Sequence, residues 1–250
     1  MPGSGVPKVR LDALLVGRGL APTRQKAQAL VLAGRVRVGG QVVDKPGKLV
    51  AVDADVTVAS PEHPWVSRGG VKLTGALASF GVSPQGKRCL DIGASTGGFT
   101  HVLLAGGARE VVAVDVGKGQ LHWSLRQDPR VQVVEGINAR YLKPEDVGGG
   151  VFDLITVDVS FISVRLILPR LLPLLAAGGL ACVLVKPQFE VGRGGVGKGG
   201  VVRDPQLREA AIQKVIAESQ ALGFEVLARC ASPLPGPAGN LEEFVLFGRG

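Results

Sequence analysis

Four polar residues in this 250-residue chain stand at positions where an open α/β fold could carry out chemistry. Asp158 closes the apolar run LITVD, and Lys186 closes the run ACVLVK. Glu242 stands just before the last apolar run, and Lys72 lies upstream in SRGGVKL. A lysine at the end of an apolar strand is costly to bury without a partner. Because the carboxyl ends of parallel strands form the active sites of open sheets, we predict that Asp158, Lys186 and Glu242 contribute to an active site, whereas for Lys72 a structural role stays equally open.

A second candidate site lies at residues 89–100, CLDIGASTGGFT. This order of an apolar strand, a tight glycine turn and a helix start lets a ligand approach the backbone next to a helix N-terminus. Asp115 ends the next strand, VVAVD, where an acidic side chain can accept hydrogen bonds from both hydroxyls of an adenosine ribose. GASTGG lacks the second glycine of the NAD-binding pattern GxGxxG. A generic dinucleotide site is therefore the weaker alternative to another nucleoside cofactor.

The segment Gly192–Gly199, GRGGVGKG, nearly spells the nucleotide-binding pattern GxxxxGK[ST]. Gly199 replaces the hydroxyl residue that would bind Mg²⁺, and GVVRDP follows instead of a helix. We therefore expect a mobile loop beside the substrate and keep nucleotide hydrolysis as a minor alternative.

The elements that must position these residues alternate along the chain from Arg88 onward. Apolar and β-branched runs predict seven strands, with helices between most of them. The predicted strands are Cys89–Ile92, Glu110–Val116, Val131–Glu135, Phe152–Val159, Leu180–Lys186, Phe224–Ala231 and Glu243–Phe247. This order predicts an α/β fold, Rossmann-like, with a mostly parallel seven-stranded sheet.

The first 60 residues show a different pattern of two short helices and a hairpin. Leu11, Leu14 and Leu15 form a helical stripe, and Thr23 is a plausible N-cap for a second helix that Gly34 stops. The following run RVRV alternates strictly, and the turn GG precedes a return strand. This region predicts a small α+β domain.

Basic charge is concentrated in the same region. The chain carries a formal charge of +8, and residues 8–48 hold nine Lys/Arg against two acids, a net charge of +7. Such an imbalance in a small domain indicates a surface that binds a polyanion, with a merely solvated basic face as the alternative.

The segment RLDALLVGRGLAPTRQKAQALVLAGRVRVGGQVVDKPGKLV resembles an S4 domain, a small RNA-binding fold. The resemblance implies RNA contacts from the second helix and the hairpin. The basic residues that we expect at RNA are Arg10, Arg24, Lys26, Arg35, Arg37 and Arg68. We place this domain at residues 8–60, a Pro-bearing linker at 61–68, and the enzyme domain at 69–250.

The pattern DxGxxxGG with an acid on the second strand resembles the S-adenosylmethionine-dependent methyltransferases. The resemblance implies S-adenosyl-L-methionine as the cofactor. The residues expected to bind it are Asp91, Gly93, Ala94, Ser95, Thr96, Gly97, Asp115 and Asn138. The resemblance places Asp91, Gly93, Ser95 and Gly97 near the methionine part and Asn138, after VVEGIN, near the adenine.

The whole chain resembles the TlyA family of ribosomal RNA 2′-O-methyltransferases, related to FtsJ, some members of which have been labelled haemolysins. The motifs that carry this are SRGGVKL, CLDIGASTGGFT, VDVSFIS, KPQFEVGRGGVGKGGVVRDP and GPAGNLEEF. The resemblance implies a Lys-Asp-Lys-Glu tetrad of Lys72, Asp158, Lys186 and Glu242. Glu243 is the alternative fourth member, although the GNxE spacing favours Glu242. The implied partners are ribosomal RNA or ribosomal subunits, and the implied target is a cytidine.

The chemistry fits these residue types. A ribose 2′-hydroxyl is a weak nucleophile until its proton leaves, so the enzyme must align it with the sulfonium methyl group and supply a base or a polarising group. Lys186 is our candidate, and two roles remain open for it: a base, or a cation that stabilises the developing alkoxide. This scheme requires no metal.

Two other classes of function remain as alternatives. A non-catalytic RNA-binding or ribosome assembly factor would keep the fold without the activity. A membrane-active haemolysin would need a signal or a spanning segment, and MPGSGVPKVR and the Pro-interrupted stretch 166–185 resemble neither. Three scattered cysteines without a CxxC pair suit a reducing compartment, so we expect a cytoplasmic protein. The oligomeric state stays open.

Overall fold

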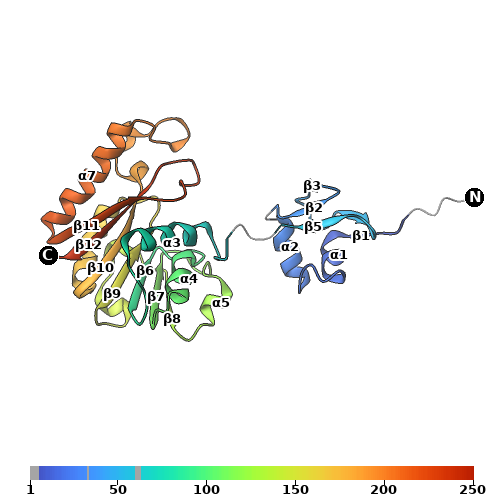
Figure 1. Ribbon diagram of the computed structural model, residues 1–250, viewed down its shortest axis with the longest axis horizontal. Helices are drawn as coiled ribbons and strands as arrows, with labels where there is room; N and C mark the ends of the chain where they lie inside the picture. Colours follow the sequence, from blue (N-terminus) through green and yellow to red (C-terminus); the bar gives the residue numbers. More distant parts are fainter. Residues whose placement is uncertain (1–5, 33, 60–62) are drawn as a thin grey trace, which may run out of the picture. The chain divides into compact units, whose positions relative to one another are not determined.

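The computed structural model describes residues 6–32, 34–59 and 63–250, and the chain divides into two compact units, Met1–Pro64 and Trp65–Gly250 (Figure 1). Residues 60–62, where the predicted first domain meets the linker, lie outside the described residues. The linker expected at 61–68 ends earlier than predicted. Trp65 stacks edge-on against His101, with ring centroids 5.3 Å apart, and a helix begins at Arg68. Residues 65–68 therefore belong to the second unit because an aromatic side chain anchors them there.

The first unit consists of two short helices and five short strands. In chain order these are β1 (Lys8–Arg10), α1 (Leu11–Gly17), α2 (Arg24–Leu32), β2 (Val36–Val38), β3 (Gln41–Val42), β4 (Leu49–Ala51) and β5 (Val56–Val58). Strand β1 pairs with β4, and β2 lies between β3 and β5, all antiparallel. The predicted stripe forms the core, because Leu11 and Leu15 are fully buried together with Ala27, Val31 and Val36.

Local signals in the sequence set the boundaries of this unit. The Thr23 Oγ1 atom accepts a hydrogen bond from the Lys26 backbone nitrogen at 3.2 Å, which confirms the predicted N-cap. Gly39 and Gly40 both have positive φ and join β2 to β3 in a two-residue hairpin, as type I′ turns require. The predicted helices and hairpin are thus confirmed.

The second unit is a seven-stranded α/β sandwich. Its helices are α3 (Arg68–Phe80), α4 (Gly98–Ala105), α5 (Trp123–Arg126), α6 (Leu168–Leu171) and α7 (Pro205–Ala221). Its strands are β6 (Arg88–Ile92), β7 (Glu110–Asp115), β8 (Val131–Glu135), β9 (Phe152–Val157), β10 (Leu175–Val185), β11 (Phe224–Ala231) and β12 (Glu243–Arg249). The spatial order is β11-β12-β10-β9-β6-β7-β8, and β12 runs antiparallel to both of its neighbours. The predicted mostly parallel sheet is confirmed.

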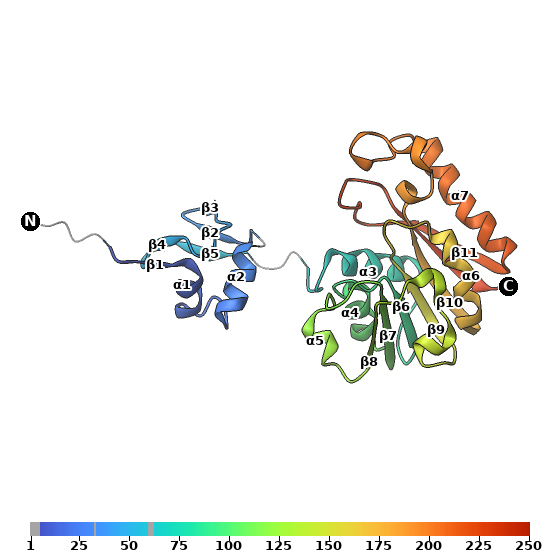
Figure 2. The same ribbon diagram turned by 180° about the vertical axis from the view of Figure 1, so that it is seen from behind.

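Alternating side chains of the central strands pack into two separate cores. On β6, Cys89 packs with α3, α4 and α5, whereas Leu90 and Ile92 pack with α6 and α7. The two groups of helices lie on opposite sides of the sheet (Figure 2). Because both faces are covered, the strands are apolar almost throughout, as the sequence showed.

Several strand bounds differ from the prediction by one to five residues, and two of these differences concern the strand ends that bear Asp158 and Lys186. Strand β9 ends at Val157 rather than Val159, and β10 ends at Val185 rather than Lys186. Asp158 and Lys186 are therefore the first residues of the loops that follow these neighbouring parallel strands. Among the described residues, no helix is long and apolar enough to cross a membrane.

Asp91 is a fully buried carboxylate in the middle of this arrangement. It accepts hydrogen bonds from Thr100 Oγ1 of α4 at 2.6 Å and from Thr156 Oγ1 of β9 at 3.0 Å. Burial raises the pKa of Asp91 to about 6, and the two hydroxyl donors partly oppose that shift. Asp91 thus joins β6 to the start of α4 and to β9.

We predict that Asp91→Asn changes the acid dependence of stability. A raised pKa means that the folded protein binds the Asp91 proton more tightly than the unfolded chain does. The contribution of this bound proton to the free energy of unfolding is therefore fully present below pH ~4. It is lost as the pH rises to about 6, by on the order of 3 kcal/mol. Urea unfolding of both proteins between pH 4 and 7 should show the Asn variant without that loss. Parallel curves for the two proteins would contradict the assignment.

Candidate active site

Two adjoining pockets open at the carboxyl ends of the central strands. The first, which we call the lysine pocket, has a volume of about 450 Å³ and is lined by Lys72 and Lys186 among others. The second, the Asp115 pocket, has a volume of about 540 Å³. Gly93, Ser95, Asp158 and Ser160 line both pockets. A ligand in one pocket would therefore meet a ligand in the other at this shared wall.

The Asp115 pocket combines one carboxylate, one amide and apolar walls. Asp115 Oδ2 accepts the Ser95 backbone N–H at 2.8 Å, and Oδ1 accepts the Gly117 N–H at 2.7 Å. Asn138 lines the same pocket, and its Oδ1 accepts the Arg140 N–H at 3.0 Å. Ile137 and Ile162 contribute apolar surface. This donor and acceptor set suits a nucleoside, with the ribose at the carboxylate.

The glycine turn after β6 brings backbone to the shared wall. Gly93 has a φ of +84°, and a Cβ atom there would lie 2.3 Å from the carbonyl oxygen of Asp158. Ser95 also has a positive φ, +47°, which is uncommon for a residue other than glycine. The turn can therefore approach β9 only without a side chain at position 93.

The lysine pocket contains the outer of two ion pairs. Lys186 Nζ lies 2.6 Å from Asp158 Oδ1 and donates a hydrogen bond to Ser160 Oγ at 2.8 Å. Of the three ammonium hydrogens, one is donated to Ser160, and the contact with Asp158 is an ion pair without hydrogen-bond geometry, so the ammonium can still donate to a ligand in the pocket. Ser160 was not predicted, although its place two residues after the strand-end Asp158 could have identified it.

The second ion pair is buried deeper. Lys72 Nζ of α3 lies 2.5 Å from Glu242 Oε2, and both residues are more than 90% buried. Glu243 instead is the first residue of β12 and pairs with Arg229. The structure thus places Glu242 with Lys72, as the GNxE spacing favoured. Glu242 does not line the lysine pocket, so it reaches a ligand there through Lys72.

The predicted cofactor residues divide into two groups. Gly93, Ala94, Ser95 and Thr96 line the lysine pocket, and Asp115 and Asn138 line the Asp115 pocket. Asp91 and Gly97 line neither pocket, and their expected place near the methionine part of the cofactor stays a prediction. The Asp91 carboxylate turns into the core toward its two threonines, and Gly97 packs against Leu121 and Leu125. These two residues therefore stabilise the glycine turn through contacts with the core.

Phe161 is an exposed aromatic residue that the sequence analysis did not single out. It is 92% exposed, has a φ of +65°, lines the Asp115 pocket and lies with its ring centroid 5.6 Å from that of Phe189. A bulky residue with positive φ is uncommon and costs conformational energy. Its position after VDVS was visible in the sequence, but its exposure depends on a backbone conformation that no pattern revealed.

The segment that carries Phe161 is fixed by a buried carboxylate. Glu190 accepts hydrogen bonds from Ser163 Oγ at 2.6 Å, from the Val164 backbone nitrogen at 2.8 Å and from Arg165 Nε at 3.0 Å. Glu190 follows β10, whereas its three donors follow β9. The loops that bear Asp158 and Lys186 are therefore tied together beyond the pocket.

The glycine-rich segment at 192–199 forms short 3₁₀ turns rather than a phosphate-binding loop before a helix. The next α-helix, α7, begins only at Pro205, after the Asp204 side chain accepts the Gln206 N–H. The order of a glycine loop followed directly by a helix, which the GxxxxGK[ST] pattern would require, is therefore not formed by these residues.

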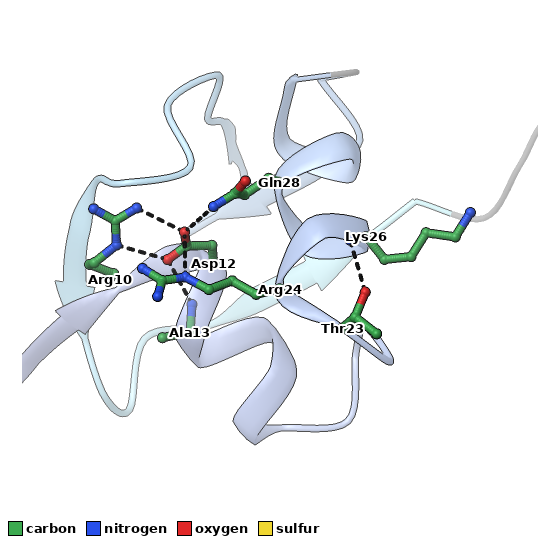
Figure 3. A network of polar contacts seen from close by, with 7 residues as sticks. All are labelled: Arg10, Asp12, Ala13, Thr23, Arg24, Lys26 and Gln28. Atoms are coloured by element: carbon green, nitrogen blue, oxygen red, sulfur yellow. Dashed lines mark hydrogen bonds and ion pairs between the residues drawn. The ribbon is translucent and has the colours of Figure 1, made fainter. Parts of the chain in front are cut away.

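In the first unit, two of the predicted RNA-binding arginines surround a buried carboxylate (Figure 3). Asp12 is fully buried and accepts hydrogen bonds from Arg10 (2.8 Å), Arg24 (3.2 Å) and Gln28 (2.9 Å). The Arg10 guanidinium above all holds the pKa of Asp12 well below its usual range. The side chains of Arg10 and Arg24 remain 46% and 57% exposed, so they can stabilise this domain and still face a polyanion.

The other predicted basic residues have no carboxylate partner among the contacts described. Arg35 donates to the Ala59 carbonyl at 2.7 Å and Arg37 to the Gly40 carbonyl at 3.0 Å. The Lys26 side chain points away from Asp12 in Figure 3. Arg68 belongs to the second unit, where it lines the lysine pocket and donates to the Pro235 carbonyl at 3.5 Å.

Comparison with known proteins agrees with this division of the chain. The FtsJ-like methyltransferase family model matches residues 65–249, and the S4 domain model matches residues 9–56. The chain therefore belongs to the FtsJ-like methyltransferase family, in the TlyA group that joins this enzyme fold to an S4 domain.

Individual relatives span nearly the whole chain. The chain is 53% identical to the 16S/23S rRNA (cytidine-2′-O)-methyltransferase TlyA of Mycobacterium tuberculosis, over 95% of this chain and 89% of that protein. It is 42% identical to Hemolysin A of Brachyspira hyodysenteriae, over 96% and 99%. Among solved structures, a “Putative hemolysin from Streptococcus thermophilus” matches with a TM-score of 0.75 and 43% identity, over 98% of this chain and 90% of that one.

The buried Lys72–Glu242 pair leads to a prediction about stability. Glu242→Leu leaves the Lys72 ammonium buried without its partner, so it should lower the free energy of unfolding by about 3–5 kcal/mol. The double variant Lys72→Met/Glu242→Leu removes both charges and should lose much less than the two single variants together. Urea unfolding of the four proteins measures this cycle. Additive losses would show that the two side chains do not interact.

Proposed function

We propose that this protein transfers the methyl group of S-adenosyl-L-methionine to the 2′-hydroxyl of a cytidine ribose in ribosomal RNA. The observation that carries the proposal is the wall shared by the two pockets, where Asp158 and Ser160 line both pockets and both contact Lys186, which lines the lysine pocket. Membership in the methyltransferase family and the activity for which the M. tuberculosis relative is named support it.

The residues present fit S-adenosyl-L-methionine. Asp115 offers a carboxylate for the ribose hydroxyls, and Asn138 and Ile137 border the space that suits an adenine. Ser95 and Thr96 of the glycine turn line the lysine pocket, where they border the space for the amino acid part. When bound, the cofactor supplies a methyl group that its sulfonium already activates. The protein then has to hold the acceptor oxygen in line and manage its proton.

Lys186 is the group that we assign to the acceptor hydroxyl. The ion pair with Asp158 and the hydrogen bond to Ser160 hold its ammonium at the lysine pocket, where it can donate to the acceptor oxygen. In this form Lys186 stabilises the negative charge that develops on the oxygen. If it is deprotonated in the complex, it takes the proton directly. Lys72, held by Glu242, adds a second positive charge to the same pocket.

The RNA would be held by two groups of side chains, one in each unit. In the first unit, the exposed faces of Arg10, Arg24, Arg35 and Arg37 suit phosphate oxygens, which position an RNA without reading its sequence. In the second unit, the exposed ring of Phe161 at the rim of the Asp115 pocket suits stacking with an unpaired base. Ribosomal RNA as the partner places the reaction in the cytoplasm.

The direct test is methyl transfer from tritiated S-adenosylmethionine to bacterial ribosomal subunits. Lys186→Ala should lower kcat by at least about 100-fold, the usual effect of losing a group that handles a proton in the transition state. The label should appear as alkali-resistant dinucleotides, which only a 2′-O-methylated ribose gives. Lys214→Ala, an exposed lysine on α7, serves as the matched control and should keep its activity within about twofold.

The outcomes separate the alternatives. Label in a base, or an active Lys186→Ala variant, would contradict the assigned chemistry. Cofactor binding without transfer to either subunit or to naked RNA would point to another acceptor. Absence of both cofactor binding and transfer would favour a non-catalytic RNA-binding factor.

A further inference from the structure

We propose that Asn240 is a positioning residue, which couples the glycine-rich loop at residues 197–202 to the segment that holds Glu242. The proposal rests on the proposed function, because it treats Glu242 and Lys72 as part of the methyl-transfer site. The proposal also assigns a role to the end of the segment at residues 192–199, which resembles a P-loop in sequence and does not form one.

The Asn240 side chain binds the end of the loop through both of its polar atoms. Its Oδ1 accepts the Val202 backbone N–H at 2.9 Å, and its Nδ2 donates to the Gly200 carbonyl at 2.8 Å. Asn240 is 2% exposed and Val202 is 3% exposed, so water cannot readily replace these bonds. One side chain therefore satisfies a donor and an acceptor of a loop about 40 residues away in sequence.

The Asn240 backbone supports the other side of this link. Its carbonyl accepts the Gly236 N–H at 2.9 Å. A Cβ atom at Gly236 would lie 2.5 Å from Glu242 Oε1, so this backbone closes directly over the carboxylate. The opposite carboxylate oxygen, Oε2, is the one that holds Lys72. A shift of Asn240 would thus move the wall of the Lys72–Glu242 pair.

The amide is the chemical requirement of this link. Asparagine offers one acceptor and two donors on the same group, whereas an aspartate is an acceptor only. The glycines at 197, 199 and 200 give the loop little conformational preference of its own, and Gly199 and Gly200 both have positive φ. Lys198 and Arg203 are exposed in or next to this loop, where they suit RNA phosphates. Asn240 would therefore fix the loop in a conformation that holds RNA near the ion pairs.

Two substitutions test the link at different strengths. Asn240→Asp keeps an acceptor for the Val202 N–H and sets a carboxylate oxygen against the Gly200 carbonyl, whereas Asn240→Ala removes both bonds. Leu241→Ala is the matched control, because Leu241 is the next residue in the chain and is 55% exposed. Limited trypsin digestion with mass spectrometry should show cleavage after Lys198 and Arg203 at least about tenfold faster in both Asn240 variants. Cleavage elsewhere in residues 65–250, and all cleavage in Leu241→Ala, should stay unchanged.

Kinetics then separate positioning from a loss of fold. For both Asn240 variants, kcat/KM for the ribosomal RNA substrate should fall at least about tenfold. The affinity for S-adenosylmethionine, measured by calorimetry, should stay within twofold, because other loops form the Asp115 pocket. Unchanged loop cleavage, or an equal loss of cofactor affinity, would overturn the proposal. If the unaltered protein methylates no RNA, the proposed function fails, while digestion and calorimetry still decide whether Asn240 holds the loop.

Discussion

The close contact between the backbones of β6 and β9 is the constraint on which the site depends. The Asp158 backbone nitrogen donates to the Ile92 carbonyl at 2.9 Å, and the Asp158 carbonyl oxygen lies where a Cβ of Gly93 would be. The glycine turn and the strand-end carboxylate therefore share one wall. Any side chain at position 93 would separate them, and with them the nucleoside site from the lysines. The parallel pairing of neighbouring strands thus does more for the site than any single polar contact.

The two ion pairs solve different electrostatic problems. Lys72 and Glu242 are both buried, so each mainly offsets the cost of desolvating the other. Lys186 and Asp158 lie at the pocket surface, with side-chain exposures of 11% and 21%, where a ligand can compete for the ammonium. The buried pair holds a positive charge in place, and the outer pair can respond to a substrate. The four residues of these pairs therefore contribute unequally, which a sequence motif cannot show.

Sequence periodicity predicted the sheet, the S4 helices and hairpin, and the strand ends that bear Asp158 and Lys186, because these follow from local apolar patterns and glycine turns. It did not show that the Asp91 carboxylate accepts hydrogen bonds from Thr100 and Thr156, because these contacts depend on how the core packs. It missed Ser160 and Phe161, whose roles depend on loop conformation. It also extended the linker to residue 68. The packing of Trp65 on His101, which assigns residues 65–68 to the second unit, joins residues distant in sequence and leaves no local pattern.

The proposed chemistry requires that a nucleoside cofactor and an acceptor occupy adjoining pockets that meet at Asp158 and Ser160. A crystal structure of the protein with S-adenosylhomocysteine would test this requirement. We expect both ribose hydroxyls within hydrogen-bond distance of Asp115, the adenine beside Asn138 and the sulfur at the wall shared by the two pockets. An adenosine bound in the lysine pocket, or one without contact to Asp115, would refute the proposed arrangement.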